Sequence, residues 1–261
     1  MRYFTRTMGL GMFLVLLFSC KKLEYDQGIT TFGEVFFIVD NVESYPHLKI
    51  KYNGNDIDQQ QGTGRIRVPE GEAKFEFYDE RSGKVLAEKS VNIEAGLAAT
   101  FIGFQPSEDA SIAFLDPDAQ NNEETPPEGF MKIKIANYSA GLLPDKVDVV
   151  FHGLVGRLYV PTDTISNVGN NLEIEQYYTV NKGNVSPSRP NYQLSFIDSE
   201  TKEEIKNLGG TIFFTTAMFA NAEKGVYTVY LTAVARDFEA PAFLEGSGKY
   251  FTIQPNILFA D

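Results

Sequence analysis

The sequence predicts an all-β protein that contains two antiparallel β-sandwiches in tandem. Residue types favoured in strands are abundant, since the chain has 21 Phe and 13 Tyr and 43% of its residues are hydrophobic. Short runs of alternating apolar and polar residues recur at the spacing of sandwich strands, and no segment shows a convincing helical period. The second half also repeats the strand pattern of the first half, which predicts two copies of one module.

The first sandwich is expected over residues 33–115. Leu48 and Ile50 alternate with two lysines, as in a half-buried strand. Asn53-Gly54 follows at once and has the chemistry of a tight hairpin turn. The other strands of this module are expected at 35–39, 65–68, 74–79, 85–93, 98–104 and 111–115.

Residues 116–129 are expected to link the two sandwiches. The segment is acidic, contains two adjacent prolines and lacks large apolar side chains. Four oxygen ligands lie close together in and before it, yet they do not match an EF-hand loop, so a solvated linker is preferred over a calcium site. These ligands are Asp109, Asp116, Asp118 and Asn121. The second sandwich, with inserted loops, is expected over residues 130–261.

Four blocks of the second module match blocks of the first module in the same order. Residues 147–153 match residues 48–54 strand position for strand position, and both blocks end in glycine. The other matched pairs are 133–137 with 37–41, 196–198 with 77–79, and 226–231 with 98–103. Matches in one order indicate a tandem duplication.

The second module is longer than the first, and the extra length is localised. Gly54 and Phe77 are 23 positions apart, whereas the matched Gly153 and Phe196 are 43 positions apart. The insert is rich in tyrosine and asparagine, which can stack on sugar rings and bond hydroxyl groups when they lie in exposed loops. The candidate ligand-binding residues are Tyr159, Tyr177, Tyr178 and Tyr192. The alternative is that these tyrosines cap the core of the sandwich.

The N-terminus resembles the signal peptide of a bacterial lipoprotein. Two arginines precede an uncharged apolar run, which is too short to span a bilayer as a helix and ends in Leu17-Phe18-Ser19-Cys20. These last four residues resemble a lipobox, in which the cysteine is acylated and becomes the first residue of the mature protein. The resemblance implies a signal peptide at 1–19, a lipid anchor at Cys20 and a tether at 20–32. A lysine follows the cysteine, which favours an outer-membrane lipoprotein that is extracytoplasmic or surface-exposed.

The second module also resembles a known family of domains. A short strand that ends in Asn137 is followed by Val147-Asp148-Val149-Val150-Phe151, a glycine and a late Tyr227-Thr228-Val229-Tyr230. This order is similar to that of an uncharacterised immunoglobulin-like domain family that occurs, often in tandem, in surface lipoproteins of the Bacteroidota type. Residues 130–235 carry the resemblance, and residues 35–104 resemble a shorter copy. It implies two immunoglobulin-like sandwiches after a lipoprotein signal peptide, and it implies no catalytic residue.

Composition and charge exclude several classes of function. The net charge is −12, and it becomes −14 if the first 19 residues are removed, because they hold two arginines and no acidic residue. Such a surface repels phosphate backbones, so no nucleic acid partner is expected. The one cysteine is the candidate lipidation residue, so the folded part is expected to hold no disulfide and no thiolate metal site.

No catalytic site, metal site or cofactor is predicted. The two histidines, His47 and His152, are interpreted as turn residues, because His152 takes the position of Asn53 in the first module. Asp79 and Asp198 recur before charged turns, where aspartate accepts hydrogen bonds from its own backbone. The chain is therefore expected not to be an enzyme.

The favoured hypothesis is a lipid-anchored, non-enzymatic protein of the cell envelope that acts as a scaffold or spacer. One alternative is a surface lipoprotein that binds a carbohydrate or peptide through loops of the second module. The expected partners are therefore the membrane, through the lipid anchor at Cys20, and a glycan or an envelope protein. A further alternative is a fimbrial or adhesion subunit that donates a strand, motivated by the apolar tail 256–259. That alternative is lost if the tail closes its own sandwich.

Overall fold

The computed structural model describes residues 30–57, 65–108, 110–139, 141–182, 191–219 and 222–261. The expected signal peptide and the candidate lipidation residue Cys20 lie outside these residues. Residues 32–261 form one compact unit. Among the described residues, no helix has the length and the apolar character that crossing a membrane would require.

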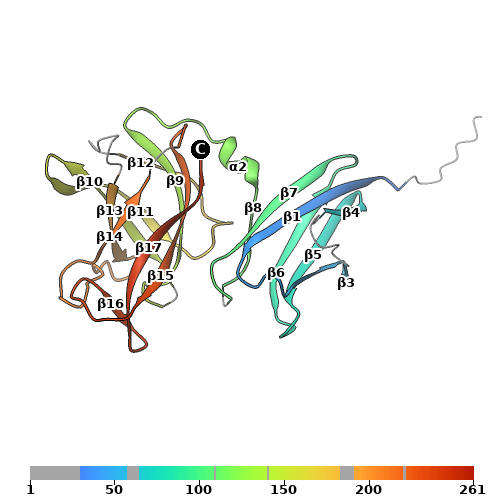
Figure 1. The fold of residues 1–261 in the computed structure, drawn as a ribbon. Coiled ribbons are helices and arrows are strands. Elements are labelled where there is room, and N and C mark those ends of the chain that lie inside the picture. The colour runs from blue at the N-terminus through green and yellow to red at the C-terminus, as the bar shows by residue number, and fades with distance from the viewer. Residues whose placement is uncertain (1–29, 58–64, 109, 140, 183–190, 220–221) are drawn as a thin grey trace, which may run out of the picture. The chain divides into compact units, whose positions relative to one another are not determined.

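The first sandwich consists of two sheets (Figure 1). The sheets enclose an aromatic core. Along β5, Ala73, Phe75 and Phe77 are buried whereas Lys74 is exposed, so the alternation of the sequence places one face of the strand in the core. The sheet orders are β4-β1-β7-β8 and β3-β2-β5-β6. The strands are β1 (Phe32–Val42), β2 (Leu48–Tyr52), β3 (Asn55–Asp56), β4 (Arg65–Pro69), β5 (Gly71–Asp79), β6 (Val85–Ile93), β7 (Ala98–Gln105) and β8 (Ala113–Leu115).

The second sandwich follows a short helix, α2 (Pro117–Asn121), and again has two sheets. The sheet orders are β12-β9-β15-β17-β16 and β11-β10-β13-β14. The strands are β9 (Phe130–Tyr138), β10 (Val147–Val155), β11 (Leu158–Val168), β12 (Tyr178–Asn181), β13 (Asn191–Asp198), β14 (Phe214–Met218), β15 (Val226–Arg236), β16 (Leu244–Gly246) and β17 (Lys249–Ala260). The all-β fold class with two tandem sandwiches is confirmed.

The two sandwiches share one strand order, and the matched residues of one sheet share one register. The orders β4-β1-β7-β8 and β3-β2-β5-β6 correspond to β12-β9-β15-β17 and β11-β10-β13-β14. Ile50 lies opposite Phe77 between β2 and β5, and the residues matched to them in sequence, Val149 and Phe196, lie opposite each other between β10 and β13. The structure therefore repeats the pairing that the sequence blocks predict between these strands. The parallel pairs differ, because Phe37 pairs with Phe101 whereas the matched Ile133 pairs with Tyr227, two positions before the matched Val229.

Each sandwich also contains a parallel strand pair, which the antiparallel expectation did not include. β1 pairs in parallel with β7, and β9 pairs in parallel with β15. The remaining ladders between the named strands are antiparallel. The parallel pair places the first strand of each module, β1 or β9, beside a strand from near the end of the same module, β7 or β15.

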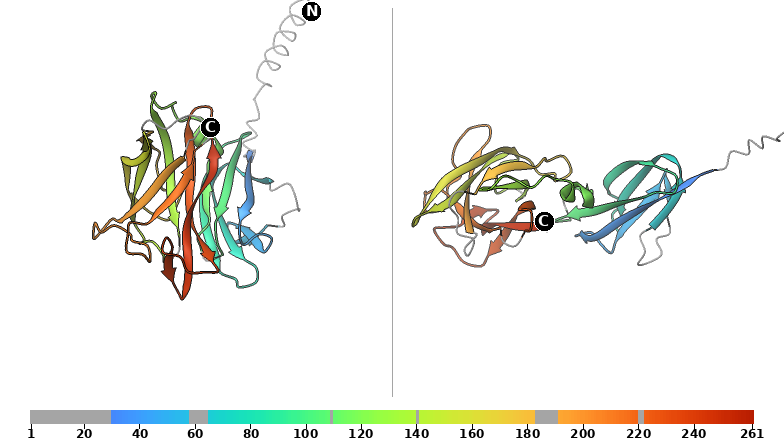
Figure 2. Two further views of the ribbon diagram at one scale, coloured as in Figure 1. Left: turned by 60° about the vertical axis from the view of Figure 1, so that its left-hand side comes forward. Right: turned by 90° about the horizontal axis from the view of Figure 1, so that it is seen from above.

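The C-terminal tail is an internal strand of the second sandwich. β17 pairs with β15 over a long antiparallel ladder that runs from Tyr227 opposite Ala260 to Arg236 opposite Tyr250, and the two strands run side by side in Figure 2. The tail therefore closes its own sandwich. The observation that motivated a strand-donating fimbrial subunit is removed by this pairing.

A third, smaller core joins the two sandwiches. Phe104 and Leu115 come from β7 and β8, whereas Ala136 comes from β9 and Leu172 comes from the loop between β11 and β12. The Phe104 ring lies 4.6 Å from that of Tyr230 on β15. The outer face of one sheet of each sandwich is therefore covered by the other sandwich.

The segment expected to be a solvated linker is partly buried in this junction. α2 contacts both β7 and β15, and Gln120 is only 6% exposed. Glu123 forms an ion pair with Lys132 at 2.8 Å. The expectation of a solvated segment was therefore wrong for Gln120, because its amide is taken up by hydrogen bonds at the junction.

Candidate functional site

The four candidate tyrosines lie in different places. Tyr192, on β13, is 2% exposed, and its ring packs 5.5 Å from the Phe219 ring in the core. Tyr178 on β12 is partly buried against the same core, and Tyr159 on β11 lies opposite Leu154 of β10. Of the four, only Tyr177 lines the pocket described below, so the structure does not bring the tyrosines together.

The pocket that contains Tyr177 lies at the junction of the two sandwiches and has a volume of about 310 Å³. This volume is at the small end of the range for ligand-binding pockets. The wall combines aromatic rings, both signs of charge, an amide and a hydroxyl group. The lining residues are Lys89, Phe101, Phe114, Leu115, Asp116, Gln120, Lys134, Glu173, Tyr177, Thr228 and Phe259.

Alternation along β9 places Lys134 at this pocket. Ile133 and Ile135 fill the core of the second sandwich, so Lys134 lies on the opposite face of the strand. Across the sheet, Lys134 is in register with Thr228 on β15, which is in register with Phe259 on β17. One row of three neighbouring strands therefore supplies a cation, a hydroxyl group and an aromatic ring.

Hydrogen bonds hold the Tyr177 side chain against this row. The Tyr177 hydroxyl lies 2.8 Å from Thr228 Oγ1 and donates to Gln120 Oε1 at 3.3 Å. Thr228 Oγ1 in turn donates to Gln120 Oε1 at 2.8 Å. Burial raises the pKa of Tyr177, while its hydrogen bond with Thr228 acts in the opposite direction. The phenol therefore stays protonated and its ring is fixed in position.

The inserted loop between β11 and β12 also ties the second sandwich to the first. Glu173 forms an ion pair with Lys89 of β6, and its second carboxylate oxygen accepts a hydrogen bond from the Phe114 amide at 3.1 Å. The Lys89 ammonium lies 5.1 Å from the centre of the Phe101 ring. The extra length of the second module thus builds part of the pocket and part of the junction.

Lys134 has no carboxylate in ion-pair range within the described part of the chain. Its ammonium lies 4.7 Å from the centre of the Tyr177 ring, in a cation–π arrangement. Burial lowers the pKa of Lys134, and the more distant carboxylates Glu123, Glu175 and Asp116 oppose that shift. The side chain is therefore a partly desolvated cation on the pocket wall.

The two histidines differ from each other in structure. His47 is exposed and lies in a turn, as expected, but the turn interpretation of His152 was wrong. His152 is 8% exposed within β10, with Nε2 2.8 Å from Ser195 Oγ and its ring 5.1 Å from that of Phe214. Burial lowers its pKa. The cause is that β10 runs on to Val155, so the hairpin turn falls beyond the position matched to Asn53.

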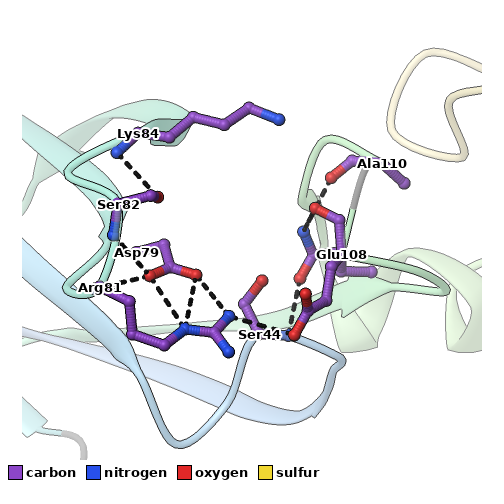
Figure 3. A network of polar contacts seen from close by, with 8 residues as sticks. Ser44, Asp79, Arg81, Ser82, Lys84, Glu108 and Ala110 are labelled. Carbon is purple, nitrogen blue, oxygen red and sulfur yellow. Dashed lines mark hydrogen bonds and ion pairs between the residues drawn. The ribbon is translucent and has the colours of Figure 1, made fainter.

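The turn interpretation of the two recurring aspartates is confirmed. Asp79 Oδ1 accepts hydrogen bonds from the backbone amides of Arg81 and Ser82 at 2.7 and 3.2 Å (Figure 3). Asp198 Oδ1 accepts from the amides at positions 200 and 201 at 2.8 and 2.9 Å, the same two offsets. The side chain of Arg81 lowers the pKa of Asp79 to about 2. Both carboxylates are thus used to hold turns.

No cluster of three or more His, Cys, Asp or Glu side chains suited to a metal ion occurs in the described ranges. Asp109, one of the four residues considered as calcium ligands, lies outside those ranges. Asp116 lines the junction pocket.

No family model matches the chain, and no curated protein matches it. Solved structures give distant likenesses. A structure described as alpha-glucan binding by a streptococcal virulence factor is 12% identical, with a TM-score of 0.24 over 77% of this chain and 93% of that chain. A CBM26-family module of Amy13K from Eubacterium rectale, solved with maltoheptaose, is 9% identical, with a TM-score of 0.25 over 86% of this chain and 96% of that chain. We base neither fold nor function on likenesses this distant.

Proposed function

We propose that the chain is a lipid-anchored, non-enzymatic protein of the cell envelope that binds a carbohydrate in the junction pocket. The observation that carries this proposal is the pocket wall, where the rings of Tyr177 and Phe101 lie among polar groups of both hydrogen-bonding types. A sugar ring has hydroxyl groups that both donate and accept, and its C–H face packs on aromatic side chains. The wall offers both kinds of contact.

The polar groups of the wall are held in place before any ligand arrives. The network of Gln120, Thr228 and Tyr177 fixes one side, and the ion pair of Lys89 with Glu173 fixes the other. Preorganised groups lose little conformational entropy on binding, which favours affinity for a small ligand. This is the arrangement expected of a binding site rather than of a surface loop.

The envelope location is supported by the sequence. The lipobox-like segment ends in Cys20, and the net charge of −12 argues against attachment through anionic headgroups. An acyl anchor would supply the attachment that the acidic surface does not. Incorporation of a labelled fatty acid, abolished by Cys20→Ser, tests this part of the proposal.

Binding is tested on the mature chain, residues 20–261, with Cys20→Ser so that it carries no lipid. Affinity electrophoresis against a panel of polysaccharides should show retention. Tyr177→Ala should weaken retention at least about tenfold, which corresponds to about 1.4 kcal/mol. Tyr159→Ala is the matched control, because Tyr159 belongs to the same insert and does not line the junction pocket.

Two results would contradict this proposal. One is the absence of retention by every polysaccharide, and the other is equal retention of both variants and the parent. Circular dichroism of Tyr177→Ala must match that of the parent for the comparison to count. Tyr177→Phe provides a second variant that keeps the ring and removes only the hydroxyl group.

A scaffold or spacer role is the second candidate. The observation that favours it is the third core, in which Phe104, Leu115 and Leu172 join the two sandwiches. A spacer must resist bending, and apolar packing at the junction provides such resistance. Small-angle scattering of Phe104→Ser should then show a larger spread of particle dimensions than the parent, and unchanged scattering would count against this role.

A further inference from the structure

Building on the proposed carbohydrate site, we propose that the ligand presents a carboxylate to Lys134, so that the pocket selects an acidic saccharide of the uronate class. The geometry that points to this is a cation on the pocket wall for which the described residues provide no carboxylate in ion-pair range, next to a ring and hydroxyl groups suited to a sugar.

Lys132 and Lys89 show how the other lysines near the pocket are satisfied. Lys132, two residues before Lys134 on β9, forms an ion pair with Glu123 at 2.8 Å. Lys89, on the facing wall, pairs with Glu173. Lys134 differs from both, since its nearest described partner is the Tyr177 ring at 4.7 Å.

An ammonium group carries three donors and no acceptor, so a buried one needs oxygen partners. Lys134 is half-buried, and the desolvation of its ammonium lowers its pKa. A carboxylate placed against it would return the charged form to its ordinary stability and would form charge-assisted hydrogen bonds. Binding energy would therefore come from relieving a cost that the free protein already carries.

Three carboxylates act on Lys134 from a greater distance, and none of them takes the place of a ligand. Glu123 is held by Lys132. Glu175 accepts the Gly169 amide at 3.0 Å, and burial raises its pKa. The third, Asp116, is an exposed residue of the pocket wall. A ligand carboxylate in direct contact with Lys134 would lie closer to the ammonium than these groups do.

A peptide C-terminus would bring the same carboxylate chemistry. The remaining wall favours the saccharide, because Gln120, Thr228 and Tyr177 present amide and hydroxyl oxygens around one aromatic ring. A peptide would instead require partners for its amide groups along an extended path. The peptide is therefore an outcome of the test rather than the proposal.

The test is calorimetric titration of the mature chain with Cys20→Ser. The ligands are a galacturonate trisaccharide, its methyl ester, a neutral malto-oligosaccharide, and trialanine with a free or amidated C-terminus. We expect the galacturonate to bind best, and we expect esterification to weaken it at least about tenfold. Binding should also weaken as salt concentration rises, because the contact is between charges.

The variants separate the charge of Lys134 from its packing. Lys134→Met keeps most of the side-chain volume and should lose galacturonate binding to the same extent as esterification does, whereas Lys134→Arg keeps the charge and should retain most of it. Lys249→Met is the control, because Lys249 is an exposed lysine of β17 that does not line the pocket, and it should bind as the parent does. Urea unfolding midpoints verify that each variant is folded.

The other results overturn the inference in distinguishable ways. Equal binding of the neutral oligosaccharide and the galacturonate, unaffected by Lys134→Met, would overturn the carboxylate contact and leave the carbohydrate function standing. Binding of trialanine but of no saccharide would overturn both the uronate assignment and the carbohydrate function. Absence of binding by every saccharide of this set, with retention of other polysaccharides in electrophoresis, would overturn the uronate assignment alone.

Discussion

The two sandwiches differ on equivalent faces of two equivalent sheets, β3-β2-β5-β6 and β11-β10-β13-β14. The face compared is the outer one, which is turned away from the core of its own sandwich. In the first sandwich, Lys51 of β2, Glu76 of β5 and Glu88 of β6 lie in one row across the outer face of the sheet β3-β2-β5-β6. Lys51 pairs with Glu76 at 3.0 Å, and Lys74 pairs with Glu88 at 2.8 Å. This face therefore carries ion pairs that are partly or fully exposed to solvent.

The corresponding row of the second sandwich carries no charge. Val150 of β10 lies opposite Ser195 of β13, which lies opposite Phe214 of β14. His152, two residues after Val150, bonds to Ser195 and packs its ring on that of Phe214. The order and pairing of these strands are the same as in the first sandwich, but this row is uncharged and largely apolar.

The comparison shows which positions fix the fold and which are free to change. The inward residues Ile50 and Phe77 are replaced by Val149 and Phe196, which keep their apolar character and their register. Exposed ion pairs contribute only about 0–1 kcal/mol each, so their loss from the second sandwich costs the fold little. The core and the turns therefore define the module, and the outer face can be altered without changing it.

The strongest way to break this comparison is to truncate the matched core rings. Phe77→Ala and Phe196→Ala each remove a ring that is 0% exposed. Each should lower the free energy of unfolding by about 3–5 kcal/mol, because burial is lost and a cavity remains. Urea unfolding followed by tyrosine fluorescence and circular dichroism measures both losses.

Leu97→Ala is the control for these core variants, because Leu97 is 59% exposed. It should change the free energy of unfolding by less than about 0.5 kcal/mol. A large loss of unfolding free energy for one of the two phenylalanine variants and a small loss for the other would contradict this comparison, because it would show that matched positions do not contribute equally to stability.

Sequence patterns predicted much of the fold because its determinants are local. Alternation identifies the strand that contains Leu48 and Ile50, and Asn53-Gly54 turns with positive φ angles of 46° and 82°. The recurring Asp79 and Asp198 mark turns that are hydrogen-bonded at the same offsets. Each of these signals depends on residues close together in the chain.

The candidate site was harder to predict because its residues meet only through tertiary contacts. Tyr177 was selected from the composition of the insert. In the sequence, Lys134 and Thr228 look like the ordinary polar residues of alternating strands, so nothing marks them as site residues. Gln120 lies in a segment that was interpreted as solvated. Only the packing of one sandwich on the other places these side chains around one pocket.

A smaller effect is expected from exchanging residues at the turns that follow the two aspartates. Gly83 and Lys202 take equivalent places there, with φ angles of 69° and 60°, so the lysine adopts a left-handed backbone that glycine adopts freely. Gly83→Lys should lower the free energy of unfolding by about 1–2 kcal/mol. No atom lies within 4 Å of the Cβ that this change adds, so backbone strain alone is measured.

The reverse exchange tests what compensates the strain at Lys202. Its ammonium bonds to Asp148 Oδ2 at 2.8 Å, and the Asp148 carboxylate is nearly buried. Lys202→Gly relieves the backbone strain and also removes this hydrogen bond, so the two effects on the free energy of unfolding should nearly cancel. Lys202→Ala removes the hydrogen bond but keeps the backbone strain, so it should lower the free energy of unfolding. A stabilisation by Lys202→Ala in thermal unfolding would contradict this account.

The smallest expected effect concerns His152, which occupies the position of β10 that is matched to Asn53 in the first sandwich. Burial lowers the folded-state pKa of His152, so the folded protein binds a proton less readily than the unfolded chain does. As the pH falls below about 6.5, the unfolded chain gains protons first, and the free energy of unfolding should therefore decrease. His152→Asn should remove this part of the pH dependence. Urea unfolding at pH 7.5 and pH 5 gives the difference, in which the carboxylates shared by both proteins cancel. Equal pH dependence in the parent and His152→Asn would mean that the charged imidazole is tolerated on this face, and the contrast between the two outer faces would then be one of shape rather than of charge.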